Sequence, residues 1–277
     1  MEGTSRVSSP FGAEPVEEVP LIRAPLARVL TQIRFPRLSA LSVNDDAANR
    51  IAIELAADFP IFNEGREQVV TITPEGVSQQ PGAGRNWQLQ DAEQEWQVTF
   101  APDFVALHTS AYVDRHHFVE RLNQVIKCFA DVARPPRTDR IGMRYINRLE
   151  EQHLARLPEL LRPEMLGGLA VPTVPQHVLV VHALNEALYN LPSTAPHYVD
   201  SLQARWGQIP AGATLDPTLP PVSTPSFLLD LDSFRMGHGE FTPSAISDCA
   251  SELAERAYRF FRWTVTEQFL DEFGAEG

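Results

Sequence analysis

The chain has 277 residues, of which 43% are hydrophobic and 21% charged, so it can bury a sizeable core as one large domain or two modest ones. Its formal net charge of −13 argues against a dedicated nucleic-acid-binding protein, because neutralising phosphates needs a surplus of lysine and arginine. No apolar run approaches the roughly 18 residues of a membrane span, and the N-terminus lacks the basic and apolar segments of a signal peptide. We therefore expect a cytoplasmic protein with neither a membrane nor a nucleic-acid partner.

The sequence contains none of the short motifs that mark common enzymes and cofactor sites. Patterns such as HExxH, GxSxG, GxxxxGK[ST] and GxGxxG do not occur. The two cysteines, Cys128 and Cys249, lie in helical patterns and form no CxxC or Cys/His cluster, so we interpret them as small reduced core residues. We therefore expect no metal and no cofactor, assign no catalytic residue, and favour a protein that is not an enzyme.

The first half of the chain alternates strands and helices. Residues 1–20 are rich in Ser, Pro, Gly and Glu, which predicts a disordered leader. The pattern then predicts strands at 24–35, 67–73, 87–91, 95–100, 104–110 and 140–149, helices at 44–59 and 114–132, and a Gly- and Pro-rich loop over 74–84.

The second half has longer irregular stretches. Its pattern predicts a short helix at 150–161, strands at 176–183, 204–209 and 226–234, an irregular Pro-rich region over 185–225, and a long helix opened by Thr242-Pro243. We predict an α+β fold in which antiparallel-dominated sheets carry amphipathic helices on one face. The expected organisation is a leader (1–20), an N-terminal half (21–150) and a C-terminal half (151–277); a coarse echo between the halves leaves open whether they are one domain or two.

The most patterned stretch is the strand at 139–150, DRIGMRYINRLE. Because side chains alternate across a strand, Arg140, Arg144 and Arg148 share one face, while Tyr145 and Asn147 lie on the other. Guanidinium groups bind carboxylate or phosphate bidentately, so these five residues are our candidates for binding a ligand or a partner.

A structural interpretation of the arginine row competes with the functional one. Asp230 and Asp232 alternate on a later strand, and pairing with the arginines would hold the two halves together; we favour this interpretation. His238 and Glu240 flank a glycine and could transfer a proton, although a plain loop explains them as well.

Three short motifs resemble those of a sporadically distributed family of bacterial proteins of unknown function. They are Arg34-Phe35-Pro36, the GxRYxNR strand from Gly142 to Arg148, and the LDxD strand from Leu229 to Asp232 before a long terminal helix. The resemblance implies a fold and no mechanism. The sporadic distribution of that family suggests an immunity, antitoxin or defence-associated role.

Two functional hypotheses remain. The first is a non-enzymatic cytosolic binding module that engages a protein partner or its own copy, supported by the acidic composition, the missing catalytic motifs and the adaptable loops of residues 185–225. The second is a sensor of a small anionic ligand, or an enzyme of unrecognised type, with a pocket near the strand at 140–148, between the sheet and the helices and lined by Arg144, Tyr145 and Arg148.

Overall fold

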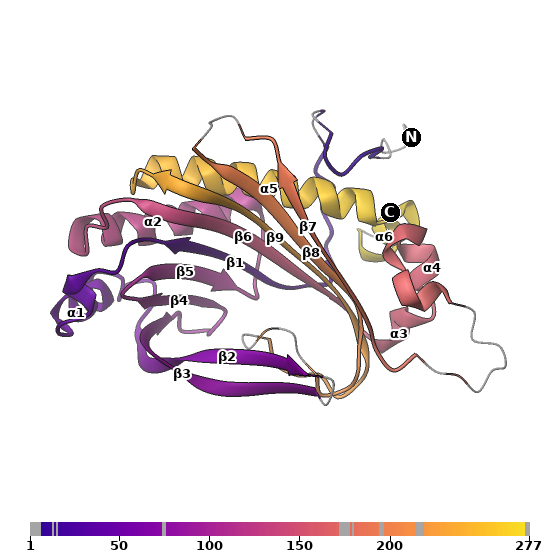
Figure 1. Cartoon of the computed structure of the whole chain (residues 1–277), viewed down its shortest axis with the longest axis horizontal. Helices are drawn as coiled ribbons and strands as arrows, with labels where there is room; N and C mark the ends of the chain where they lie inside the picture. The colour runs from indigo at the N-terminus through magenta and orange to yellow at the C-terminus, as the bar shows by residue number, and fades with distance from the viewer. Residues whose placement is uncertain are drawn as a thin grey trace.

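The structure is a computed structural model that describes residues 7–12, 14, 16–73, 76–171, 178, 180–193, 197–213, 216 and 219–274, without the side chains of residues 66–83. One antiparallel sheet dominates it, with nine strands in the order β2-β3-β4-β5-β1-β6-β9-β8-β7 (Figure 1). The strands are β1 (Leu26–Arg34), β2 (Ile61–Thr73), β3 (Gly76–Gln90), β4 (Trp96–Ala101), β5 (Phe104–Thr109), β6 (Thr138–Leu149), β7 (Ala183–Leu191), β8 (Val199–Ile209) and β9 (Ser226–Gly239). The predicted α+β class is confirmed. Strands of both predicted halves meet in this one sheet, where β6 pairs with β9.

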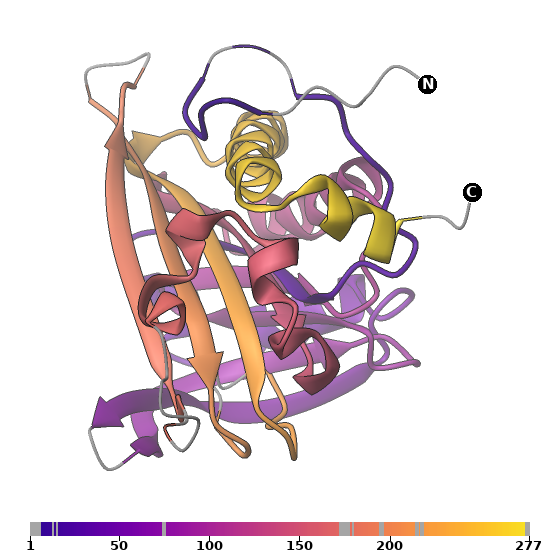
Figure 2. The same ribbon diagram turned by 90° about the vertical axis from the view of Figure 1, so that its right-hand side faces the viewer.

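Two long helices, α2 (Arg115–Val132) and α5 (Pro243–Thr264), cover one face of the sheet, which bends around them (Figure 2). Each helix buries an apolar stripe at helical spacing, as the sequence predicts. The shorter helices are η1 (Ser39–Leu41), α1 (Asp46–Glu54), α3 (Glu151–Leu154), α4 (Leu157–Leu160), η2 (Pro163–Met165), η3 (Gly167–Ala170) and α6 (Glu267–Phe273). Within the described ranges, no helix combines the length and apolarity needed to cross a membrane.

The predicted loop over residues 74–84 is wrong for most of its length. Residues 76–84 continue as the first part of β3, paired along β2. Proline lacks the N–H that a ladder uses, and the register of this hairpin shifts between Arg66 and Gln68, next to the position that faces Pro81. The irregularity in the ladder therefore accommodates the proline. The Gly- and Pro-rich composition of residues 74–84 is typical of a loop, which is why the sequence predicted one.

Two predictions in the second half are also displaced. Of the predicted strand at 176–183, residues 176, 177 and 179 lie outside the described part of the chain, and residues 178 and 180–182 are not in a strand, so the prediction is wrong for them. The strand of this region is β7, which begins at Ala183 and runs into the stretch expected to be irregular. The predicted helix over 150–161 is two short helices, α3 and α4. Pro158 stands at the start of α4, where its missing N–H and its clash with the preceding backbone prevent one continuous helix.

The N-terminal segment, predicted as a leader, touches the body of the protein in its described residues. The ring of Phe11 lies 4.8 Å from that of Tyr189 and 5.9 Å from that of Phe260, between centroids. The backbone oxygen of Val7 accepts a 2.6 Å hydrogen bond from Arg162 Nη2. Residues 1–6, 13 and 15 of that predicted leader lie outside the described residues.

Removing the N-cap of α2 should destabilise the protein modestly. The carboxylate of Asp114 accepts a 2.7 Å hydrogen bond from the backbone N–H of His117, which has no partner within the helix. We expect Asp114→Ala to lower the free energy of unfolding by about 1 kcal/mol in urea denaturation. Asp114→Asn keeps an accepting oxygen and should recover most of the loss; equal losses in both variants would contradict a capping role.

Candidate functional site

The arginine row of β6 lies on the face of the sheet away from α2 and α5. Arg144 binds Asp230 of β9 through two hydrogen bonds of 2.7 and 2.9 Å, and its third nitrogen binds Asp216 at 2.5 Å. Asp216 comes from the connection between β8 and β9, and this residue of the connection therefore lies against the sheet. The aspartate pairing that the sequence favoured is thus present in the structure.

Two further arginines complete this network. Arg205 of β8 also binds Asp230, with hydrogen bonds of 3.0 and 2.5 Å, so that one carboxylate serves two guanidinium groups. Arg140 binds Asp232 at 2.7 Å, and its guanidinium carbon lies 4.5 Å from the ring centroid of Phe234. The network links three adjacent strands, β6, β9 and β8, and leaves Arg144 no open bidentate edge for a ligand.

Burial and charge set the protonation of the residues around this network. Burial acts to lower the pKa of Arg144, but the negative charge of Asp230 and the hydrogen bonds to it outweigh burial, so the pKa lies above its ordinary value. Burial, reinforced by the charge of Arg28, lowers the pKa of His108 on β5 to about 4. His108 is therefore neutral at pH 7, while the arginines remain charged.

Arg148 differs from the other two arginines of the row. One of its nitrogens donates to the backbone oxygen of Pro220 at 3.0 Å, whereas Nε and Nη2 are buried and find no partner within the described residues. Burial lowers its pKa. Because neither nitrogen is accessible, Arg148 fastens the β8–β9 connection to the sheet and presents no open site.

Tyr145 and Asn147 face the helices, across the sheet from the arginine row, and line a cavity of about 550 Å³. We call it the tyrosine cavity. It lies between β6, the start of α2, α5 and the N-terminal segment. Its walls are formed by residues 18–22, 24, 26, 110–115, 145, 147, 254, 257, 258 and 261. The sequence predicts a pocket between the sheet and the helices lined by Arg144, Tyr145 and Arg148. The structure has Tyr145 in the wall of such a cavity, but the lining prediction is wrong for Arg144 and Arg148, which lie on the opposite face of the sheet.

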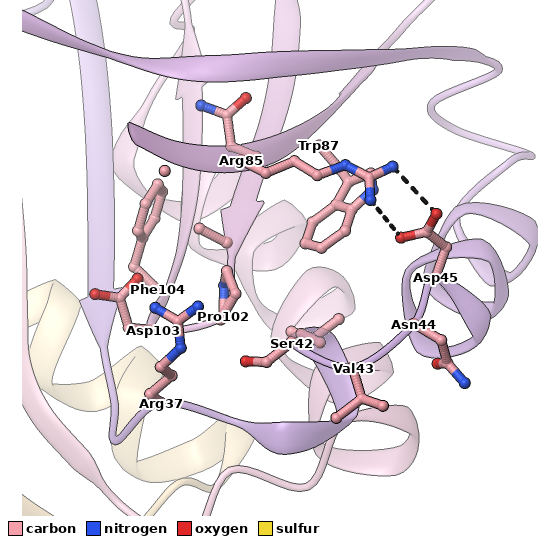
Figure 3. Close-up of a pocket in the computed structure, with 14 residues that line it drawn as sticks. Arg37, Ser42, Val43, Asn44, Asp45, Arg85, Trp87, Pro102, Asp103 and Phe104 are labelled. Atoms are coloured by element: carbon pink, nitrogen blue, oxygen red, sulfur yellow. Dashed lines mark hydrogen bonds and ion pairs between the residues drawn. The ribbon is translucent and has the colours of Figure 1, made fainter. Parts of the chain in front are cut away.

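A second cavity of about 480 Å³ lies near α1 and the β4–β5 turn (Figure 3). Arg37 and Asp103 stand on one side of it, and Arg85 extends above Trp87 on the other. Arg85 is already held by Asp45 at 2.8 Å and by Glu64 at 2.9 Å. The charged groups around this cavity largely offset one another, so it offers no concentrated charge to a ligand.

Among the described residues, His238 and Glu240 do not lie together with other side chains that could form a catalytic or ligand-binding site with them. Both are exposed, and His238 Nε2 lies 3.7 Å from a carboxylate oxygen of Asp139 at the surface. β9 runs through residue 239, so these two residues stand at the end of a strand and not on the loop that the sequence suggests.

The described residues also hold no cluster of three or more His, Cys, Asp or Glu side chains suited to a metal ion. Burial raises the pKa of both Cys128 and Cys249 to about 11. Both thiols are therefore protonated at pH 7 and poor nucleophiles.

Among the described residues, the sheet ends at β7, which pairs with β8 alone and packs near its start against η3 (Figures 1 and 2). Its nine residues, ALNEALYNL, contain one charged side chain, Glu186, and neither lysine nor proline. Leu184 and Leu188 point away from the helices and are exposed, Leu188 by 61%. Within its nine residues, β7 therefore lacks the lysine, proline and bulges that often protect an edge strand.

Sequence reasoning did not identify β7, Arg205, Asp216 or His108 as candidates. Asp216 lies in a Pro-rich stretch without periodicity, so its sequence neighbours give no sign of its partner. Arg205 does alternate within a predicted strand, and that alternation could have placed it beside Asp230 if the strand order were known. Comparison with known proteins adds no identification: no family model matches the chain, and no curated protein is detectably similar to it.

Proposed function

We propose that the protein is a non-enzymatic cytosolic binding module that pairs with a second copy of itself through the outer edge of β7. The observation that carries the proposal is the edge position of β7: among the described residues this strand pairs on one side only, and exposed leucines lie along it. Self-association of this kind suits the immunity, antitoxin or defence-associated role that the family resemblance suggests.

The β7 sequence favours its own copy as the occupant. In an antiparallel pair centred on Leu188, this leucine faces its symmetry mate, and Glu186 faces Asn190, whose amide can donate to the carboxylate. A pair centred on Glu186 would instead set two carboxylates against each other. The Leu188 register therefore joins apolar to apolar and acceptor to donor at the sheet edge.

The charge of the whole chain makes the choice of edge significant. Two copies that each carry a formal charge of −13 repel one another at long range. β7 has a single charged residue, and Glu186 already accepts a hydrogen bond from Gln203. An edge almost free of charge is the part of an acidic molecule at which two copies meet with least repulsion, and added salt should strengthen the contact.

Replacing Leu188 by lysine should separate the two copies. Leu188→Lys removes an apolar pair and places two ammonium groups together, so we expect the dissociation constant of the dimer to rise roughly tenfold or more. Sedimentation equilibrium over a wide range of protein concentration measures it.

The matched control is Ile53→Lys on α1, which adds the same charge at a side chain that is 74% exposed and far from β7 in sequence. It should leave the dissociation constant unchanged. A wild-type protein that sediments as a single chain at every concentration and salt would overturn self-association, as would equal weakening by the two lysine variants.

A further inference from the structure

The tyrosine cavity has the size and surface of a small-molecule site. Its volume of about 550 Å³ falls within the range of ligand pockets, roughly 300–1,000 Å³. Tyr145 lies on β6 in the middle of the sheet and yet keeps accessible surface, because it borders this space. The cavity therefore extends inward to β6, an inner strand of the sheet, and is deeper than a surface depression.

Most of the cavity wall is apolar. On α5, Ala254 and Ala257 present small side chains where larger ones would fill the space, and Phe261 closes the far end. Leu21 and Leu26 contribute aliphatic surface from the opposite side. The charged lining residues belong to the N-terminal segment and the start of α2. Desolvating an ion against apolar walls is costly, so the interior suits an uncharged ligand.

Two tyrosine hydroxyls supply a directed polar contact. The side chains of Tyr112 and Tyr145 lie against each other in the cavity wall, with their ring centroids 5.8 Å apart, and each phenol affects the pKa of the other. Burial raises the pKa of both phenols, so both hydroxyls keep their protons at pH 7. Two phenol hydroxyls have two protons, so even when one hydroxyl donates to the other, one proton remains to donate to an acceptor in the cavity.

The N-terminal segment roofs the cavity and is tied to α5. The hydroxyl of Tyr258 accepts a 2.7 Å hydrogen bond from the backbone N–H of Val19 and donates to the backbone oxygen of Glu17 at 3.3 Å. Glu18 forms an ion pair with Arg115 beside it. Among the described lining residues, the charged side chains thus belong to the roof and rim of the cavity, where they are exposed or paired with each other.

We propose that the tyrosine cavity binds an uncharged, largely apolar small molecule whose carbonyl oxygen accepts a hydrogen bond from the Tyr112–Tyr145 pair. The apolar walls supply affinity through burial of the ligand body, and the hydroxyl pair selects for an acceptor. The site is separate from β7, and its occupation does not depend on self-association.

Three related probes test this proposal by isothermal titration calorimetry on the full chain. They are 2-acetylnaphthalene, which has an apolar body and a ketone; naphthalene, which lacks the acceptor; and 2-naphthoate, which carries a charge. We expect the ketone to bind about tenfold more tightly than naphthalene, and the carboxylate to bind more weakly than both. Failure of the ketone to bind, or tighter binding of the carboxylate, would overturn the proposal.

Two variants in the cavity and one control outside it test where the probes bind. The double change Tyr112→Phe and Tyr145→Phe removes both hydroxyls and should reduce the affinity for the ketone to that for naphthalene, while Tyr189→Phe, outside the cavity, should change neither. Ala257→Leu places a larger side chain in the cavity and should abolish binding of all probes. If that variant does not fold, the double variant decides, since naphthalene binding reports an intact cavity. Unchanged preference for the ketone in the double variant would refute the proposal.

Discussion

Replacing Asp230 by asparagine should lower the free energy of unfolding by about 3–5 kcal/mol. Asp230 is 2% exposed and receives four hydrogen bonds from Arg144 and Arg205. Asparagine keeps the shape and loses the charge, so the guanidinium groups of Arg144 and Arg205 would lose the carboxylate that they share. Asp216 would remain the carboxylate hydrogen-bonded to Arg144. Urea denaturation should show a lower midpoint with an unchanged slope.

An exposed ion pair provides the matched control for this variant. Asp45 binds Arg85 with similar geometry, at 2.8 and 3.1 Å, but the two side chains are 42% and 47% exposed. Water screens such a pair, so Asp45→Asn should cost less than about 1 kcal/mol. Equal losses at Asp230 and Asp45 would show that the buried network does not stabilise the sheet in the way we infer.

The protein should lose stability between pH 6.5 and pH 4 because of His108. Burial, with the charge of Arg28, holds its pKa at about 4 in the folded protein, against 6.5 for an unperturbed histidine, although the charge of Asp216 partly opposes the shift. Between these values the unfolded chain binds the proton and the folded chain does not. The contribution of His108 to the free energy of unfolding is therefore fully present above pH 6.5. It falls as the pH falls, by about 2 kcal/mol between pH 7 and pH 5.

A comparison of two glutamine variants isolates this contribution. His108→Gln does not titrate, so the difference in unfolding free energy between pH 7 and pH 5 should shrink by that amount, while other titrating groups contribute equally to both proteins. His116→Gln, at an exposed position in the first turn of α2, should retain the wild-type difference. The same pH dependence in His108→Gln would show that other groups cause it.

Periodicity predicted the elements that bury one face. Phe118 and Leu122 on α2, like Ile141 and Met143 on β6, repeat at helical or strand spacing because the core requires it. The arginine row was predictable for the same reason, since alternation separates Arg144 from Tyr145 whatever surrounds them.

Elements without such a pattern could not be predicted. β7 has only its inner side chains partly covered, and its register comes from pairing with β8, far beyond the reach of local composition. The order of strands in the sheet determines which acidic side chain pairs with which basic side chain. Neither residue spacing nor charge in the sequence reveals that order. This is why Asp216 and His108 were missed. The pocket between the sheet and the helices was predicted beside Tyr145, but Arg144 and Arg148 were wrongly included in its lining, since alternation puts them on the other face of the strand.

The strand order also determines the sequence in which the protein can fold. The pairs β2–β3, β4–β5 and β8–β9 join consecutive strands, whereas β1 pairs with β6 and β6 with β9 across long stretches of chain, as Leu30 with Arg144 and Arg144 with Asp232. Closing long loops costs entropy before any contact repays it, so the middle of the sheet forms last and slowly. Until β9 arrives, β6 is a bare edge and Arg144 has no carboxylate from that strand. In such a partly folded chain, the exposed edge of β6 is the site most vulnerable to aggregation, although β6 is an inner strand of the folded sheet.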